Sequence, residues 1–286
     1  MDFLDLESGP IRPHEARYTL MLAPFDGTST YMKGSDRGPE ALIAASANLE
    51  LYDIPTGSEA WNSGIATYRP ILNFTNPETM TDSVRTETAH LMDLGTMPII
   101  IGGEHSVSPG AVWAAAERHP GLTVLQLDAH SDLRNEYEGS RFNHACAMAR
   151  ITEVCPVVQV GIRSMDAGEL ESMNTDRVFF AHEIYNRTDW QTDVLELLGD
   201  DVWITIDLDV FDPSLMPSTG TPEPGGLDWY AVDSLVRKVV AVKNLIGFDV
   251  VELLPGSNPA PDFTAAKLVY GIISAHYTKE RALEEQ

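Results

Sequence analysis

Short, almost continuous apolar runs alternate with longer amphipathic stretches along most of this chain, and this alternation constrains its fold more than any other feature. Runs rich in Val, Ile and Leu are typical of strands covered on both faces, as in a parallel sheet. The runs predict strands over 18–25, 97–103, 122–128, 157–162, 177–181, 202–207 and 244–252. The stretches between them predict helices over 39–49, 80–94, 107–119, 143–152, 189–199, 228–241 and 261–278.

This order of elements predicts an α/β fold, a three-layer sandwich with a central, mostly parallel sheet. No internal repeat or low-complexity linker divides the chain, so residues 1–286 are expected to form a single domain. Residues 1–17 are expected to form an N-terminal arm, and the stretch 53–77, rich in Pro, Gly and Asn, a surface loop. Ser106, Asn143 and Asp228 are expected to cap the helices that begin at about 107, 143 and 228. Ligands of such a sheet bind outside the carboxyl ends of its strands.

Composition excludes several classes of partner. Lys and Arg total 19 against 43 Asp and Glu, a formal charge of −24, which disfavours nucleic acids and anionic membrane surfaces. A cationic substrate, a bound metal or a saline habitat fits better. The two cysteines, the lack of a secretory signal at the N-terminus and the lack of an apolar run of about 20 residues predict a cytoplasmic protein without a membrane partner.

The motif DAHSD carries the strongest chemical signal. Asp128, His130 and Asp132 come directly after an apolar run. Alternate residues of an extended segment point to the same side, so the three side chains are expected to project together from a strand end. A capped turn is the structural alternative for this motif alone. However, unpaired buried carboxylates are costly, which favours a bound cation.

Two more predicted strands end in the same way. Asp207 and Asp209 follow one of them in DLD, and Glu104 and His105 follow another in GGEHS. Carboxylates and imidazoles suit two divalent ions of the manganese type, and the absence of thiolates from the motifs argues against structural zinc. Either motif alone has a structural explanation, but their joint occurrence favours a metal site. The six candidate ligands are His105, Asp128, His130, Asp132, Asp207 and Asp209.

The three motifs GGEHS, DAHSD and ITIDLDVFDPSLMPSTGTPEPGG together resemble the signatures of the ureohydrolase family, which contains arginases and agmatinases. The resemblance runs from about residue 33 through Glu252 and the last predicted helix. It implies a parallel-sheet sandwich of the kind that metal-dependent deacetylases share. It also implies two Mn²⁺ ions per chain that supply hydroxide near neutral pH. Hydroxide attack on a guanidinium carbon would release urea and an amine.

The resemblance also assigns roles to single residues. One ion would be held by His105, Asp128, Asp132 and Asp207. The other would be held by Asp128, His130, Asp207 and Asp209, so that Asp128 and Asp207 bridge the two. His144, in RFNHACAM, matches the family's proton-shuttle histidine, with a histidine packed at a helix start as the alternative. Glu252, in GFDVVELLP, matches the carboxylate that anchors the guanidinium group, with a solvated strand-end acid as the alternative.

The segment after DAHSD favours agmatine as the substrate. Arginases usually carry Asn two positions after the third metal Asp, where this chain has Arg134. The loop therefore resembles the agmatinase branch, although Arg134 and Arg141 would repel an ammonium group unless they are turned away. The sequence predicts hydrolysis of agmatine to putrescine and urea. N1-aminopropylagmatine, guanidinobutyrate, guanidinopropionate, guanidine and arginine remain alternatives.

Two interpretations outside ureohydrolysis also remain open. One is a metal-dependent polyamine deacetylase, which would need a single zinc ion with fewer ligands. The other is a non-catalytic partner subunit, against which the complete ligand set argues. The family resemblance further implies a homotrimer or homohexamer.

Overall fold

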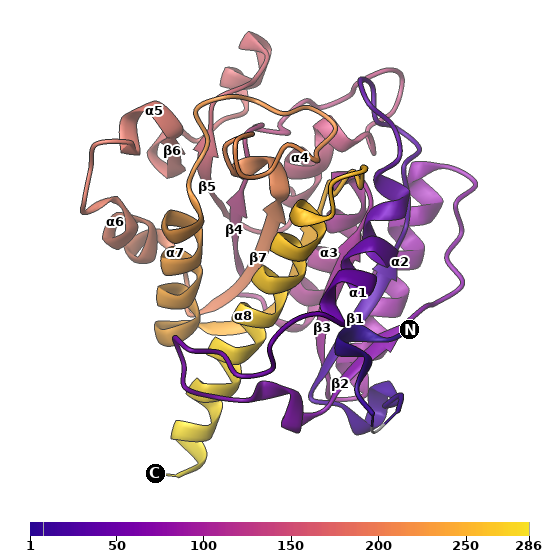
Figure 1. The fold of residues 1–286 in the computed structure, drawn as a ribbon. Helices are drawn as coiled ribbons and strands as arrows, with labels where there is room; N and C mark the ends of the chain where they lie inside the picture. The colour runs from indigo at the N-terminus through magenta and orange to yellow at the C-terminus, as the bar shows by residue number, and fades with distance from the viewer. Residues whose placement is uncertain (8, 286) are drawn as a thin grey trace.

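A computed structural model describes residues 1–7 and 9–285, and within them eight strands form one sheet in which every pairing is parallel (Figure 1). The strand order is β2-β1-β3-β8-β7-β4-β5-β6. The strands are β1 Tyr18–Ala23, β2 Ile65–Tyr68, β3 Met97–Gly102, β4 Thr123–Leu127, β5 Val157–Ile162, β6 Val178–Phe180, β7 Asp201–Asp207 and β8 Asn244–Val251. Seven of them match predicted apolar runs, and the predicted α/β fold is confirmed.

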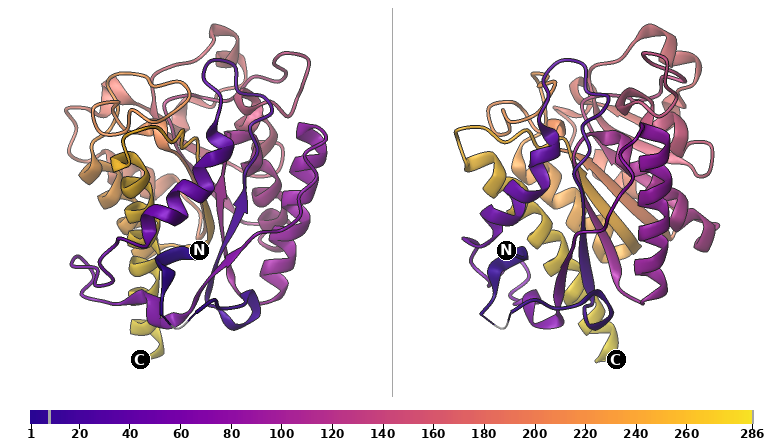
Figure 2. Two further views of the ribbon diagram at one scale, coloured as in Figure 1. Left: turned by 45° about the vertical axis from the view of Figure 1, so that its right-hand side comes forward. Right: turned by 90° about the vertical axis from the view of Figure 1, so that its right-hand side faces the viewer.

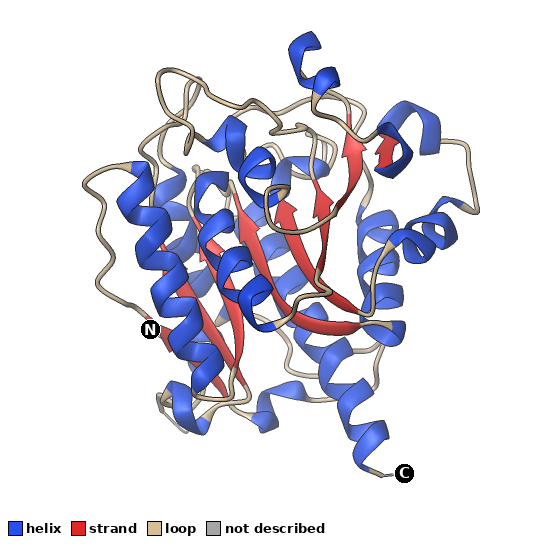
Figure 3. Ribbon diagram, turned by 180° about the vertical axis from the view of Figure 1, so that it is seen from behind, coloured by secondary structure: helices blue, strands red, loops and turns tan. Residues whose placement is uncertain are grey.

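Helices cover both faces of this sheet (Figures 2 and 3). One face carries α1 Gly38–Ser46, α6 Trp190–Leu197, α7 Trp229–Val242 and α8 Ala260–Glu284. The other carries α2 Pro77–Asp93, α3 Ser108–Arg118 and α4 Ala147–Ile151, and the short α5 Ala181–Ile184 follows β6. Alternate strand residues fill two cores, as when Leu20 packs on one side and Met21 on the other. Among the described residues, no helix is long and apolar enough to cross a bilayer.

The segment 53–77 is not entirely a surface loop, because it contains the edge strand β2. Ile65 and Ala66 of β2 are buried and pair with β1. Four residues between glycine- and proline-rich flanks are too few to show a strand pattern in the sequence. Phe3 and Leu4, in the predicted N-terminal arm, are also buried in the core.

Two of the three predicted caps are found. Asn143 caps the short helix that begins at His144 by accepting a hydrogen bond from the amide of Ala145 at 3.0 Å. Asp228 caps α7 by accepting a hydrogen bond from the amide of Ala231 at 2.8 Å. Ser106 does not cap α3, because a 3-10 turn over His105–Val107 lies in between. Its hydroxyl instead donates to the Glu104 carboxylate at 2.6 Å.

Gly103, in the turn after β3, gives a test of how tightly the backbone packs beside the site. A Cβ atom at this position would lie 2.1 Å from the carbonyl oxygen of Phe25. We expect Gly103→Ala to lower the free energy of unfolding by about 1–3 kcal/mol, because overpacking forces the backbone to shift. Gly121→Ala is the matched control, because nothing lies within 4 Å of its added Cβ. Equal denaturant midpoints for the two variants would contradict the expected clash.

Candidate metal centre and active site

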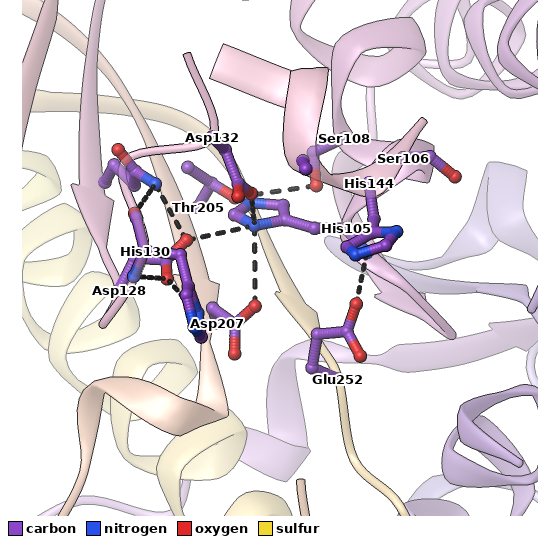
Figure 4. Close-up of polar contacts among 12 residues, drawn as sticks. His105, Ser106, Ser108, Asp128, His130, Asp132, His144, Thr205, Asp207 and Glu252 are labelled. Atoms are coloured by element: carbon purple, nitrogen blue, oxygen red, sulfur yellow. Dashed lines mark hydrogen bonds and ion pairs between the residues drawn. The ribbon is translucent and has the colours of Figure 1, made fainter. Parts of the chain in front are cut away.

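Four neighbouring strands, β3, β8, β7 and β4, end at one edge of the sheet and place seven of the eight predicted site residues there (Figure 4). His105 follows β3, and Glu252 follows β8 directly. The DLD motif lies at the end of β7, and DAHSD follows β4. The eighth residue, His144, begins a short 3-10 helix after the DAHSD loop. The sheet topology therefore joins motifs that are far apart in the sequence.

His105 faces three of the predicted carboxylate ligands. Its Nδ1 lies 3.1 Å from Asp128 Oδ2, 3.0 Å from Asp132 Oδ2 and 3.5 Å from Asp207 Oδ2. This nitrogen is buried, yet it has no hydrogen-bond partner among the described residues. Three carboxylate oxygens thus converge on one imidazole nitrogen, which is a suitable ligand set for a divalent ion.

The hydrogen bond on the opposite side of the ring indicates the tautomer of His105. Nε2 lies 2.9 Å from the Thr205 hydroxyl, and that hydroxyl donates its only proton to Asp249 at 2.6 Å. Because the Thr205 oxygen can then only accept from the ring, Nε2 carries the ring proton and Nδ1 keeps a lone pair. A lone pair among carboxylate oxygens is repulsive unless a cation lies between them. The residues present therefore fit a metal ion.

A second group lies beside the first and shares Asp128 with it. His130 Nδ1 lies 2.9 Å from Asp209 Oδ2 and 3.7 Å from Asp128 Oδ1. In each group, one potential ligand atom from every residue lies within 4.8 Å of the others. The two groups are His105, Asp128 and Asp132, and Asp128, His130 and Asp209. The structure thus brings all six predicted ligands together, with Asp207 facing the first group.

The electrostatics of the site show an excess of buried negative charge. Burial and then the neighbouring Asp209 raise the pKa of Asp128 to about 7, and the same two causes raise the pKa of Asp207 well above its ordinary value. Burial also favours the neutral form of Asp209, but the adjacent His130 outweighs it and lowers the pKa of Asp209 to about 2. Protons or cations must neutralise such a cluster.

The backbone adopts an uncommon conformation at two site residues. Asp132 has φ 53° and Glu252 has φ 66°, in the left-handed region that few residues other than glycine adopt. At Glu252, the amide donates to the Gly103 carbonyl at 2.7 Å, and carboxylate Oε1 accepts from the His105 amide at 2.8 Å. Strained positions of this kind concentrate at functional sites, where the surrounding structure holds them.

Two buried glutamines that the sequence analysis missed orient Asp128. Gln159 on β5 donates to Gln126 on β4 at 2.6 Å, and Gln126 donates to Asp128 Oδ2 at 2.7 Å. Both glutamines are buried. Buried polar groups need such partners, so a glutamine inside an apolar run was the available signal.

A cavity of about 220 Å³ opens at this edge, and its lining includes His105, Asp207 and Asp209 together with His144 and Glu252. The two residues predicted to act on the substrate therefore line the same space as the candidate metal ligands. In the view of Figure 4, His144 and Glu252 lie on the same side of the carboxylate cluster.

The two arginines that argued against a cationic substrate have their own partners. The Arg134 guanidinium lies 4.5 Å from the ring centre of Tyr137 and 3.7 Å from Asp166, and all three residues line the cavity. Arg141 pairs with Glu153 at 2.8 Å on the exposed surface. The charge of each arginine is thus at least partly offset within the protein.

Comparison with known proteins identifies the family. A family model described as "Arginase family" matches residues 16–274. The chain belongs to this family. It is 36% identical to an N(1)-aminopropylagmatine ureohydrolase of Synechocystis sp., with 94% of this chain and 92% of the relative covered. It is 32% identical to an agmatinase of Pyrococcus horikoshii, with 94% and 95% covered.

A solved structure agrees with these relatives. The agmatine ureohydrolase of Thermoplasma volcanium superposes with a TM-score of 0.87 at 31% identity, covering 95% of this chain and 94% of that one. The predicted ureohydrolase family is therefore confirmed. With it, the chain is identified as a hydrolase acting on guanidino C–N bonds.

The raised carboxyl pKa values predict how metal binding depends on pH. Asp128 and Asp207 hold protons more tightly when folded, so their contribution to metal-free stability falls as pH rises from about 4 through about 7. A divalent ion replaces those protons most effectively at high pH. We therefore expect Mn²⁺ to raise the melting temperature more at about pH 8 than at about pH 5.5.

Two variants test the source of that effect. Asp209→Asn is expected to reduce the number of ions bound per chain from two to one in equilibrium dialysis, because it removes a ligand of the second group. Asp166→Asn is the matched control, since Asp166 lines the cavity but belongs to neither group. A melting temperature that does not respond to Mn²⁺ at either pH would contradict the metal centre.

Proposed function

We propose that this chain hydrolyses the guanidino group of N1-aminopropylagmatine, releasing urea and the corresponding polyamine. The observation that supports this proposal is the sequence identity between this chain and its relatives. Two relatives named N(1)-aminopropylagmatine ureohydrolase are 36% and 38% identical to the chain, whereas the Pyrococcus agmatinase is 32% identical. Agmatine, the substrate that the sequence motifs favour, is the second candidate. The Pyrococcus relative and the agmatine ureohydrolase structure support it.

The charges around the cavity are consistent with a substrate that is cationic beyond its guanidino group. Asp166 and Glu169 belong to the lining together with Arg134. Glu169 is buried, and its two oxygens accept from the amides of Leu133 at 3.0 Å and Asp166 at 2.6 Å. The Asp166 side chain is about half exposed, so an acidic group remains accessible at this part of the cavity. The net charge of −24 would also favour the approach of a polycation at low salt.

We further propose that the cluster holds two Mn²⁺ ions. The proposed ligands of one are His105, Asp128, Asp132 and Asp207, and those of the other are Asp128, His130, Asp207 and Asp209. Hard carboxylate oxygens combined with imidazole nitrogens favour manganese over zinc, which prefers sites with thiolate or fewer ligands. When bound, two such ions lower the pKa of water enough to supply hydroxide near neutral pH.

Glu252 is proposed to anchor the guanidinium group. Burial, followed by the nearby Glu104, raises the pKa of Glu252 well above its ordinary value. A guanidinium cation in the cavity would reverse that effect and favour the carboxylate, because opposite charges stabilise each other in a buried site. Two oxygens facing two N–H groups would also fix the orientation of the planar group.

His144 is proposed to donate a proton to the amine as the C–N bond breaks. An amine leaves poorly as an anion, and imidazole is the side chain best suited to carry a proton to such a group. The position of His144 in the lining of the same cavity as Glu252 supports this role.

Assembly and location stay predictions. The family resemblance favours a homotrimer or homohexamer. The sequence favours the cytoplasm and a small cationic guanidino compound as the substrate, without a nucleic-acid or membrane partner.

A substrate panel tests the proposed function. We expect Mn²⁺-loaded protein to release urea from N1-aminopropylagmatine with a higher kcat/KM than from agmatine, because the longer substrate adds one more ammonium group that can meet acidic side chains. Arginine, guanidinobutyrate, guanidinopropionate and guanidine are expected to react more slowly than either. A higher kcat/KM for agmatine would select the second candidate. Absence of turnover with every compound would overturn both.

Substitutions test the proposed roles separately. His144→Asn is expected to lower kcat by about 10²- to 10⁴-fold with little change in KM, because it removes a general acid. Glu252→Gln is expected mainly to raise KM, by roughly 10- to 100-fold, because a charged hydrogen-bond partner is lost. His119→Asn is the control, since His119 pairs with Asp201 at the opposite edge of the sheet. A normal kcat for His144→Asn would refute its assigned role.

A further inference from the structure

A chain of hydrogen bonds joins a buried carboxylate, a hydroxyl and His144. Glu104 bonds to Thr28, and Thr28 bonds to the His144 ring. We propose that Thr28 is a positioning residue that fixes the tautomer of His144, with Glu104 determining the direction of the Thr28 hydroxyl. This inference deepens the proposed function, since it assumes that His144 carries the proton to the leaving amine.

Glu104 serves as an acceptor for a loop from another part of the chain. It is fully buried. Its Oε2 accepts from the backbone amides of Thr28 at 2.7 Å and Ser29 at 2.9 Å, and its Oε1 accepts from the Ser106 hydroxyl at 2.6 Å. Backbone amides can only donate, so the carboxylate holds the loop after β1 in one position. This position brings the Thr28 side chain to His144.

The hydrogen-bonding capacity of Thr28 is fully used. Its hydroxyl has one proton and two lone pairs. The proton is donated to Glu104 Oε1 at 2.6 Å. One lone pair accepts from the His144 backbone amide at 2.9 Å. The contact that remains, 3.1 Å to His144 Nδ1, can only be one in which the ring nitrogen donates.

It follows that neutral His144 carries its proton on Nδ1 and has a free lone pair on Nε2. The Nδ1 side of the ring faces Thr28, so Nε2 is the nitrogen left for the cavity that the ring lines. A proton taken up there gives the imidazolium. Transfer of that proton from Nε2 to the departing nitrogen, as the C–N electron pair moves onto it, returns the neutral Nδ1–H tautomer. The hydrogen bond to Thr28 is kept throughout, so no ring rotation is required.

Three variants of the same loop separate positioning from folding. Thr28→Val keeps the shape of the side chain and removes the hydroxyl. Thr28→Ser restores the hydroxyl. Ser29→Ala is the control, because the Ser29 hydroxyl bonds to Asp26 in the same loop and to Glu104 and makes no hydrogen bond with His144 among the described residues. We expect Thr28→Val to lower kcat at least about tenfold with KM nearly unchanged, and both other variants to stay within about threefold of the wild type.

The tautomer itself is measured by nitrogen-15 NMR of histidine-labelled protein, loaded with diamagnetic Zn²⁺ in place of Mn²⁺. The His144 signals are assigned by their loss in His144→Asn. The wild type and Thr28→Ser are expected to show a protonated Nδ1 and an unprotonated Nε2 in the neutral ring. Thr28→Val is expected to show a mixture of the two tautomers, together with an altered pH profile of kcat.

The outcomes distinguish this inference from the proposed function. A neutral wild-type ring protonated on Nε2 would overturn the inference, and so would a Thr28→Val variant with wild-type tautomer and kcat. An equal loss of kcat in Ser29→Ala would also overturn it, because the loop rather than the hydroxyl would then be responsible. If the wild type hydrolyses no guanidino compound, the proposed function fails, while the NMR spectrum of the wild type still decides the tautomer.

Discussion

The buried carboxylates at the carboxyl ends of β4 and β7 are the constraint on which the rest of this structure depends. The buried Asp128 and Asp207 both face His105 Nδ1, at 3.1 and 3.5 Å, and the buried Asp209 shares a second group with Asp128. Such a group is stable only if counter-charges and hydrogen-bond donors surround it. The strands that bring the group together are apolar along their length, and two helical layers exclude water from them. The fold therefore places these carboxylates in a low-dielectric environment, and the proposed cations would neutralise their charge there.

Two histidines show how the surrounding structure selects different chemistry for the same side chain. In both, a buried carboxylate orients a threonine hydroxyl, and that hydroxyl accepts from the ring. At His105, Thr205 occupies Nε2, so Nδ1 faces the carboxylates as a potential metal ligand. At His144, Thr28 occupies Nδ1, so Nε2 is left for the cavity. The hydrogen bond on the far side of each ring thus decides which nitrogen is available, a known way of setting histidine roles.

The sequence predicted the parts of the molecule that depend on local patterns. Long apolar runs identified seven strands, and polar residues at their ends identified the six candidate ligands, because both signals lie within a few residues of one another. The four residues of β2 escaped detection, since an edge strand this short has no period to measure. The proposed role of Thr28 could not have been found either, because it depends on contacts with Glu104 and His144, which lie 76 and 116 residues away in the sequence. Glutamine inside a buried strand, as at Gln126, was a signal present in the sequence but not used.

The difference between local sequence patterns and contacts between distant residues also explains why the reaction class was easier to predict than the substrate. The groups proposed to act on the guanidino end are fixed by strand ends, whose positions follow from the sheet. The remaining part of the cavity is formed by loops. There, the ion pairs and contacts of each charged side chain determine the electrostatic potential at the substrate. From its charge alone, Arg134 argues against a cationic substrate. In the structure, the Arg134 guanidinium lies over the Tyr137 ring and near the Asp166 carboxylate, and these two groups offset part of its positive charge. Specificity for the part of the substrate beyond its guanidino group must therefore be derived from which charged side chains are paired within the protein. A count of the charges in the loop is not enough.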